Sequence, residues 1–460
     1  MRGPWLGAII FLFVWSLTTH GKYSASGDEP HYLMITQSLA ADGDLDVANN
    51  YADNDGRLFG HDGLAMGLHA VRTRTGRTLS IHDVGVGVVL VPAYVVARRI
   101  AGVTSESLLR RFRMDRGLFT YSIVALLLIA MTSAGMVLLA AGLGEAFGQA
   151  PAAPLVLAAA ISPPIVSHAF LVFPEAFALF ATCVVVWFSL KAPRENDKRL
   201  LLVVMLLIGV LPWMHHKYLL YVPGLVWVVA WHRWPLIQTA PGAAVAACTA
   251  MLLPQLALFA WTWHEWGTLG GALTAQGVPF SLAALKNGAI GLWIDRQSGL
   301  LAYAPIYWVM PACVALTWRR TWPFLLPAIL LYLPAAAFVI GWWAGFAPAA
   351  RYLVPAMPLL LVPIAGALRL STIRGALYVL VVFQAAIDIV VWQHPRALWP
   401  APQGNPALAL LGVVGRAYES ALPAIRSSGM SMKAAWLCTA AAVMSAALVT
   451  RAGAKSTIEH

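Results

Sequence analysis

Long apolar segments recur along the whole chain, and they constrain its fold more than any other feature. A helix needs about 20 apolar residues to cross the hydrocarbon core of a bilayer, and backbone polar groups cannot stay unpaired in lipid. We therefore predict an all-α polytopic membrane protein that forms a single integral-membrane domain over residues 1–460. About 12 transmembrane helices are expected, in the segments 4–20, 117–140, 152–168, 174–190, 199–214, 218–231, 238–262, 302–318, 322–343, 355–370, 375–393 and 434–451.

The charged residues and cysteines exclude several other classes of protein. Only 11% of residues are charged, whereas a soluble domain carries about a quarter. Basic cytoplasmic loops and contacts with lipid phosphates account for the net charge of +11. No nucleic-acid partner is expected, because the sequence contains no long soluble basic region. The four cysteines all lie inside apolar runs, which argues against a disulfide framework or a zinc knuckle.

The distribution of basic residues predicts which loops face the cytoplasm. Residues 84–100 form a doubtful apolar segment, and the orientation of everything after it depends on whether this segment crosses the membrane. If it does not cross, five basic loops and both termini share one side, which the positive-inside rule assigns to the cytoplasm. Residues 21–116 then form a first extracytoplasmic loop with juxtamembrane helices, and residues 263–301 form a second large one. This arrangement is favoured, although it places the basic run Arg98 to Arg116 outside, which either marks an anionic-lipid site or contradicts the arrangement.

Acidic residues are scarce and are concentrated in the first loop. Of the 20 in the chain, 11 lie between residues 21 and 116. Asp28 and Glu29 follow the first apolar segment, and Asp28 stands at the N-cap of an expected helix, Pro30–Ala41, along the membrane surface. Polar groups at membrane depth are costly and usually functional, so the favoured topology predicts an active site on the extracytoplasmic face. Its further polar side chains are His82, Arg116, His168, Glu175, His216, Lys217, Tyr218, Asp295, Arg351 and Tyr352.

Short motifs around these residues carry a family resemblance over most of the chain. The motifs are Asp28-Glu29 after the first span, His82-Asp83 at the end of the long loop, Arg116 opening the next span, Pro174-Glu175 after Ser162-Pro163-Pro164, and Pro212-Trp213 before Lys217-Tyr218. In this layout the chain resembles the GT-C superfamily of integral-membrane glycosyltransferases, in the branch of the protein O-mannosyltransferases and the lipid A aminoarabinose transferase. Two departures are His82-Asp83-Val84 in place of the common His-Pro-Pro and the expected lack of a soluble C-terminal domain. They leave the acceptor open more than the core chemistry.

This resemblance implies a glycosyltransferase in the bacterial inner (plasma) membrane. Its donor would be a polyprenyl-phosphate-linked sugar, and its acceptor a hydroxyl of a glycan, lipid or protein. Asp28 matches the catalytic base of the family, with Glu29 orienting Asp28 or the acceptor. The leaving phosphate gains negative charge and needs cations, which Lys217, Arg351 and Arg116 would supply. Direct displacement would invert the anomeric centre, and supporting roles are expected for His82, His168, Glu175, His216, Tyr218, Tyr352 and Asp295.

Simpler structural roles stay open for the same residues. Asp28 can be only an N-cap, Lys217 a lysine that snorkels to the interface, and Arg351 an interface anchor. No cofactor is expected. A divalent metal stays open but is not favoured, because His215-His216 lacks a ligand partner at helical spacing.

Two competing functions also stay open. A transporter or flippase of a lipid-linked sugar would need polar residues near the middle of the bilayer, and Gln384 and Asp388 are rare examples in this chain. A non-catalytic scaffold of an envelope complex would need none of the clustered outer charges.

Overall fold

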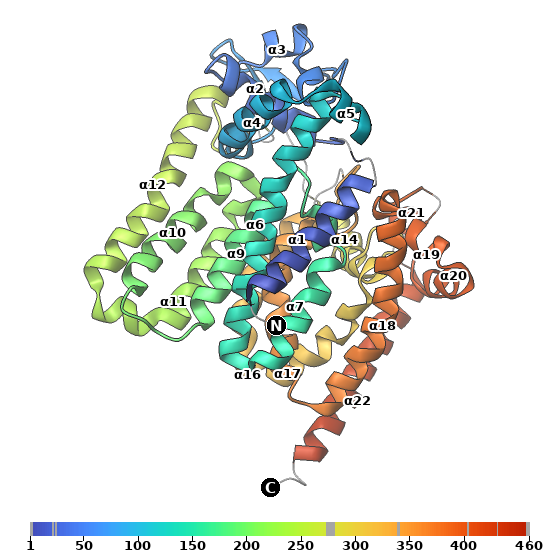
Figure 1. Ribbon diagram of the computed structural model, residues 1–460. Coiled ribbons are helices and arrows are strands. Elements are labelled where there is room, and N and C mark those ends of the chain that lie inside the picture. The colour runs from blue at the N-terminus through green and yellow to red at the C-terminus, as the bar shows by residue number, and fades with distance from the viewer. Residues whose placement is uncertain are drawn as a thin grey trace.

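The computed structural model describes residues 3–20, 23, 25–272, 281–337, 341–402, 404–429 and 431–456. The chain is mostly helical, as predicted. Long helices form a bundle, and the first loop covers the end of the bundle that is uppermost in Figure 1. The principal helices are α1 (Gly3–His20), α6 (Arg116–Phe147), α7 (Gln149–Ile161), α9 (Pro174–Leu190), α10 (Asp197–Met214), α11 (Tyr221–Thr239), α12 (Pro241–Trp266), α14 (Leu282–Ile294), α16 (Met310–Ala337), α17 (Met357–Ala367), α18 (Ser371–Gln393) and α22 (Met432–Ser456).

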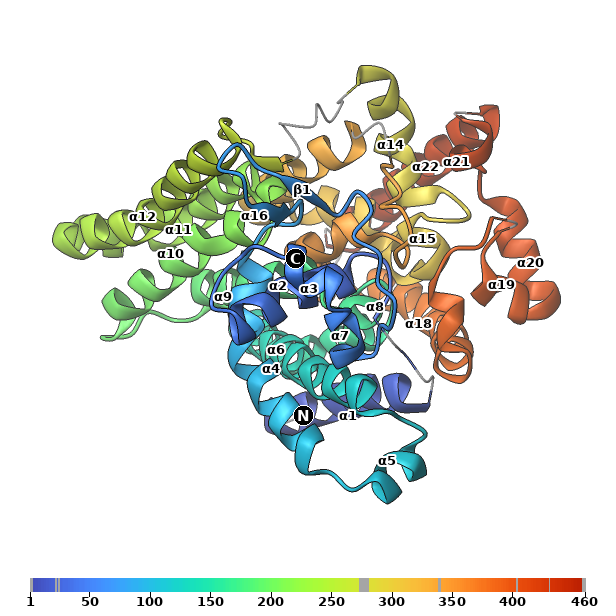
Figure 2. The same cartoon turned by 90° about the horizontal axis from the view of Figure 1, so that it is seen from above.

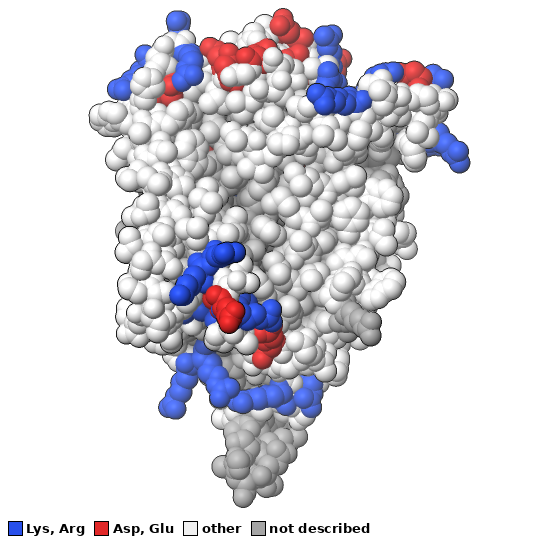
Figure 3. Space-filling view, turned by 60° about the vertical axis from the view of Figure 1, so that its left-hand side comes forward, with Lys and Arg blue, Asp and Glu red and all other residues white. Residues whose placement is uncertain are grey.

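Several of the described helices are suited to a bilayer. By length and composition, α4 (Gly85–Val103), α6, α12 and α18 are long and apolar enough to cross a membrane. On the face drawn in Figure 3, charged side chains gather at the top and in the lower half of the molecule, and an uncharged belt separates the two groups. Such a belt suits contact with lipid, because charge at hydrocarbon depth is costly. The chain is an integral membrane protein.

The first loop folds into a compact layer of short elements. It contains α2 (Glu29–Ala41), α3 (Ala48–Ala52), η1 (Asp55–Phe59), the antiparallel strands β1 (Ala70–Arg72) and β2 (Thr78–Ser80), α4, and α5 (Glu106–Phe112). The helix predicted over Pro30–Ala41 is present, but it is buried from Glu29 to Ser38 rather than lying open on the surface. The physical reason is that α4 covers it. At the crossing of the two helices, a Cβ on Gly87 would lie only 2.6 Å from Ile35 Cγ2.

The doubtful segment 84–100 forms most of α4. This helix packs against α2 and α6, and in Figure 1 it lies near the upper end of the molecule, below α2. Figure 2 shows it from above. That position agrees with the arrangement in which residues 84–100 do not cross, and the orientation of the chain stays a prediction. The basic residues Arg98 and Arg99 are exposed on it.

Cysteine labelling tests this orientation. We expect Ser105→Cys, in a background with the exposed Cys248 and Cys438 replaced by Ser, to react with a membrane-impermeant maleimide from the extracytoplasmic side, because Ser105 lies between α4 and α5. The matched control is Lys198→Cys, at an exposed residue in the second position of α10, which should react only from the cytoplasmic side. Reaction of both positions from the same side would contradict the orientation.

The second half of the chain departs from the predicted spans. We predicted a loop at Arg319 and Arg320 between two spans, but α16 continues through both residues, which are exposed and are good helix formers. Of the second predicted loop, residues 273–280 lie outside the described residues. The remaining short elements are α8 (Ile165–His168), η2 (His216–Leu219), α15 (Leu300–Tyr303), η3 (Pro305–Val309), η4 (Arg351–Ala356), η5 (Pro395–Leu398), α19 (Pro406–Leu410), α20 (Gly412–Ala421) and α21 (Ile425–Ser428).

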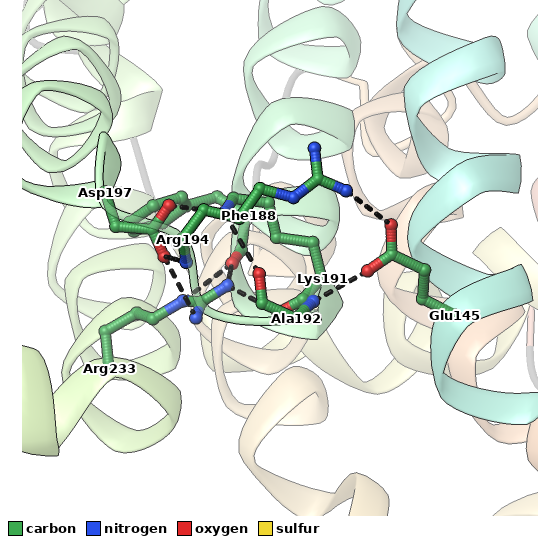
Figure 4. Close-up of polar contacts among 7 residues, drawn as sticks. All are labelled: Glu145, Phe188, Lys191, Ala192, Arg194, Asp197 and Arg233. Carbon is green, nitrogen blue, oxygen red and sulfur yellow. Dashed lines mark hydrogen bonds and ion pairs between the residues drawn. The ribbon is translucent and has the colours of Figure 1, made fainter.

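A cluster of ion pairs joins helix ends at the lower end of the bundle (Figure 4). Lys191 binds Asp197, and Arg233 Nη1 lies 3.5 Å from Asp197 Oδ2. Arg194 lies 3.6 Å from Glu145 at the end of α6. We name these five residues the lower clamp. Each cation has a carboxylate, which is the condition under which buried charges are tolerated, so the lower clamp holds α6, α9, α10 and α11 together.

Candidate active site

Four charged side chains from distant parts of the chain meet beneath the first loop. Asp28 precedes α2, Glu175 lies in the first turn of α9, Lys217 lies in η2, and Arg351 begins η4. Arg351 Nη1 donates to Asp28 Oδ2 over 2.9 Å, and its Nε donates to Glu175 Oε1 over 2.9 Å. Lys217 Nζ donates to the same oxygen of Glu175. We name these four residues the charged cluster.

Two backbone positions in the left-handed region aim Asp28 and Arg351 at each other. Gly27 has φ +59°, and a Cβ there would lie 3.0 Å from the carbonyl oxygen of Phe346. Glycine is therefore required directly before Asp28. Ala350, directly before Arg351, has φ 58°, which is unusual for a residue with a side chain. Backbone strain of this kind persists only where the surrounding structure holds it.

The turn that carries Lys217 is tied to the first loop. The chain leaves α10 in an extended conformation at His215 and enters η2. The carboxylate of Asp83 accepts from the backbone N–H of His216 over 2.9 Å and also contacts the His216 ring. Asp83 thus fixes the turn by binding His216. Because His216 directly precedes Lys217, this contact helps to position Lys217.

The charged cluster balances two carboxylates against two cations. The side chain of Glu175 is fully buried, those of Arg351 and Lys217 are 8% and 15% exposed, and that of Asp28 is 32% exposed. Burial raises the pKa of Asp28, but the charge and the hydrogen bond of the Arg351 guanidinium outweigh it and hold the pKa well below its usual range. Burial lowers the pKa of Lys217, and the Glu175 carboxylate opposes that change. Asp28 is therefore an ionised carboxylate and the most accessible member of the cluster.

Aromatic rings pack against the two cations of the charged cluster. The guanidinium carbon of Arg351 lies 4.0 Å from the centre of the Phe173 ring. Lys217 Nζ lies 5.2 Å from the ring centre of Tyr218 and 5.1 Å from that of Tyr352, so both predicted tyrosines contact a cation of the cluster. The Tyr218 hydroxyl and Oε2 of Glu175 are buried and have no hydrogen-bond partner among the described residues. Buried polar atoms normally have partners, so these two atoms are exceptions within the site.

The Glu29 side chain points away from the charged cluster and has a separate set of hydrogen-bond partners. Within the described parts of the chain, no hydrogen bond joins its carboxylate to Asp28. Burial raises the pKa of Glu29 to about 7, although its hydrogen bonds act in the opposite direction. Glu29 joins the first loop to α6 and to the segment before α9, which makes it a positioning residue. Its carboxylate accepts from the hydroxyls of Tyr23 and Tyr121 and from the backbone N–H groups of Ser26 and Val172.

Histidine rings surround Asp28 and could hold a metal ion. Ligand atoms of Asp28, His69 and His82 all lie within 4.8 Å of one another, and His69 Nδ1 lies 3.1 Å from His82 Nε2. The ring of His31 stacks on His69 at 3.6 Å. Burial lowers the pKa of His82 to about 4, which keeps the ring neutral, as a metal ligand must be. One carboxylate and two imidazoles are a ligand set that fits a divalent cation such as Zn²⁺.

Three other predicted residues make their polar contacts outside the charged cluster, although His168 is near enough to interact electrostatically with Glu175. Arg116 pairs with Glu106 over 2.9 Å and donates to carbonyls at the end of α4. His168 is buried, with Nδ1 2.9 Å from the carbonyl oxygen of Pro164. Asp295 accepts backbone N–H groups, including that of Arg426 over 2.9 Å. Across the ranges that the structure describes, no hydrogen bond or ion pair joins Arg116, His168 or Asp295 to the cluster.

Sequence reasoning missed His69, and a local signal could have found it. The β1–β2 hairpin pairs Ala70 with Ser80, which brings His69 beside Ile81 and next to His82. The run Thr73-Arg74-Thr75-Gly76 between the two strands is a turn signal, and Gly76 has φ +89°. A predicted hairpin here would have placed the two histidines together.

No protein-family model matches the chain, and no curated protein matches it. Three solved structures do. One is ArnT from Cupriavidus metallidurans bound to undecaprenyl phosphate, at 14% identity over 98% of this chain and 72% of that one, with a TM-score of 0.49. Another is the archaeal oligosaccharyltransferase AglB from Archaeoglobus fulgidus, in complex with an inhibitory peptide and a dolichol-phosphate, at 12% identity over 91% of this chain and 59% of that one, with a TM-score of 0.44. A third, the oligosaccharyltransferase of Archaeoglobus fulgidus with Zn and sulfate, has 13% identity over 87% of this chain and 58% of that one, with a TM-score of 0.39. Each of the three matches covers most of this chain, at low sequence identity.

Proposed function

We propose that this protein transfers a sugar from a polyprenyl-phosphate-linked donor to an acceptor hydroxyl on the extracytoplasmic face. The observation that carries the proposal is the accessible Asp28 carboxylate, joined through Arg351 to the buried Glu175. This arrangement places a proton acceptor beside cations in a site of low exposure. Those are the groups that sugar transfer from a phosphate needs.

Asp28 takes up the proton of the acceptor hydroxyl. As the acceptor oxygen bonds to the anomeric carbon, its proton becomes strongly acidic, so a carboxylate with a low pKa can accept it. The bond between the anomeric carbon and the phosphate oxygen breaks, and its electron pair leaves with the phosphate. Attack from the side opposite the leaving group inverts the anomeric centre.

Arg351 and Lys217 stabilise the leaving phosphate. The donor phosphate carries one negative charge and the free polyprenyl phosphate carries two, so cations bind the product-like transition state better than the donor. The guanidinium of Arg351 can bind two phosphate oxygens, and Lys217 adds a point charge. Glu175 holds both cations in place before the donor binds.

The geometry also bears on a possible metal ion and on Arg116. If Asp28, His69 and His82 held a divalent cation, that ion would supply additional positive charge beside the phosphate, and Asp28 would then be a metal ligand instead of the base. Arg116 is not part of this donor site in our proposal, because its guanidinium is bound to Glu106 at the surface.

The competing transport function has less support. A transporter needs polar groups in the middle of its bundle that can bind the substrate. Asp388 of α18 is such an intramembrane acid, but its two carboxylate oxygens accept from Ser162 over 2.7 Å and from Gln384 over 2.8 Å. Both oxygens are thus already occupied within the protein.

A transfer assay with purified protein in liposomes tests the proposed function. The probes are synthetic polyprenyl-phosphate-linked pentoses and hexoses, with an envelope extract as acceptor. We expect free polyprenyl phosphate to appear together with a modified acceptor, and mass spectrometry measures both. Movement of intact donor across the bilayer without cleavage would contradict transfer and support the flippase.

A further inference from the structure

A pocket lies at the lower end of the bundle, away from the charged cluster. It has a volume of about 400 Å³ and lies between the end of α6, the middle of α16 and the end of α17. Its wall contains three arginines, Arg319, Arg320 and Arg369, and the exposed Trp318. The helices are closely packed beside the pocket, because a Cβ on Gly366 would lie 3.3 Å from both the Phe147 ring and Thr317 Cγ2.

The three arginines of this pocket have no carboxylate. In the described residues, no acid forms an ion pair with Arg319, Arg320 or Arg369. The lower clamp nearby is different, because Asp197 and Glu145 neutralise its cations (Figure 4). Three like charges around one cavity repel each other unless an anion joins them.

Helix capping does not account for these arginines. The carbonyls of Leu368 and Arg369, directly after α17, accept from Arg374 Nη1 over 3.0 and 3.2 Å. That contact satisfies the role that a cation usually has at a helix C-terminus. The guanidinium of Arg369 is therefore left to face the pocket rather than the helix end.

We propose that this pocket binds a phosphate group, either the headgroup of an anionic membrane lipid or a soluble phosphate compound. Guanidinium groups bind phosphate oxygens in pairs, and three of them line one cavity. The volume of about 400 Å³ lies within the usual range for small-molecule pockets and exceeds what one phosphate ion fills. Trp318 is 53% exposed beside the arginines, as expected for an aromatic side chain at the membrane interface, and basic pockets between helices are typical sites of anionic headgroups.

The test compares full-length protein and a variant with Arg319→Gln, Arg320→Gln and Arg369→Gln. The probes are nanodiscs of phosphatidylcholine with and without phosphatidylglycerol, and inorganic phosphate added to protein in phosphatidylcholine alone. We measure the thermal midpoint and, by native mass spectrometry, the lipid that stays bound. We expect phosphatidylglycerol to bind the variant at least about tenfold more weakly than wild type.

The matched control removes the same charge elsewhere, through Arg57→Gln, Arg72→Gln and Arg416→Gln, three exposed arginines that do not line the pocket. It should bind at the lower pocket as wild type does. If phosphatidylglycerol alone stabilises wild type, the ligand is a lipid headgroup. If inorganic phosphate also stabilises wild type but not the variant, the pocket accepts soluble phosphate as well. Equal binding by wild type, control and variant would overturn the proposal.

A second variant shows whether a loss of binding is due to misfolding. Arg319→Lys, Arg320→Lys and Arg369→Lys keep the charge and lose the paired donors, and we expect intermediate binding. If these variants bind as tightly as wild type and phosphatidylglycerol is displaced by salt alone, the pocket has no built phosphate site and the proposal is wrong. Transfer activity is not the readout, so a failure here leaves the proposed catalytic function untouched.

Discussion

Asp28→Asn is expected to lower sugar transfer about 10²- to 10⁴-fold, the contribution of a general base. The amide keeps the shape of the side chain and can still accept from Arg351, but it cannot take up a proton. Because the Asp28 side chain is 32% exposed, the protein should still fold and insert. The measurement is the initial rate of polyprenyl-phosphate release per folded protein.

Two variants separate chemistry from folding in this experiment. Asp53→Asn, at an exposed acid of the same loop, should transfer at the wild-type rate. Glu29→Gln should instead lower the free energy of unfolding by about 1–3 kcal/mol, because an amide N–H₂ would face buried donors. Its rate per folded molecule should change little. Wild-type transfer by Asp28→Asn would remove Asp28 from the proposed mechanism.

Arg351→Gln is expected to affect both stability and transfer. Arg351 is the group that joins Asp28 to Glu175, and removing one partner of a buried ion pair costs about 3 kcal/mol or more. Loss of a preorganised cation at the leaving phosphate should lower transfer at least about 10²-fold. The measurements are the thermal midpoint and the transfer rate of the folded fraction.

The matched control for this prediction is Arg396→Gln, at an exposed arginine, which should change neither quantity. Arg351→Lys keeps the charge but cannot bind two groups as a fork, so its rate should fall between those of wild type and Arg351→Gln. A variant that is less stable but transfers at the wild-type rate per folded molecule would show that Arg351 is structural only.

Hydrophobicity and local helix signals made much of the fold predictable. The apolar runs predicted a mostly helical membrane protein because each run alone satisfies its backbone and suits lipid. The start of α2 near Asp28 and Glu29 was also predictable, since helix signals depend on neighbouring residues. The number of spans was harder. Arg319 and Arg320 look like a loop in sequence, yet α16 continues through them, because charge by itself does not break a helix.

The sequence by itself determined that acid is concentrated beside the first helix and that cations stand at the ends of later helices. Only the tertiary structure decided which of these groups meet. Asp28 makes no side-chain cap on α2 and instead binds Arg351, 323 residues away, while its neighbour Glu29 binds α6 and the segment before α9. Arg116 was an equal candidate in sequence but pairs with Glu106. The physical reason is that a carboxylate turns toward whichever donor the packed helices bring within about 3 Å, and adjacent residues of one turn point in different directions.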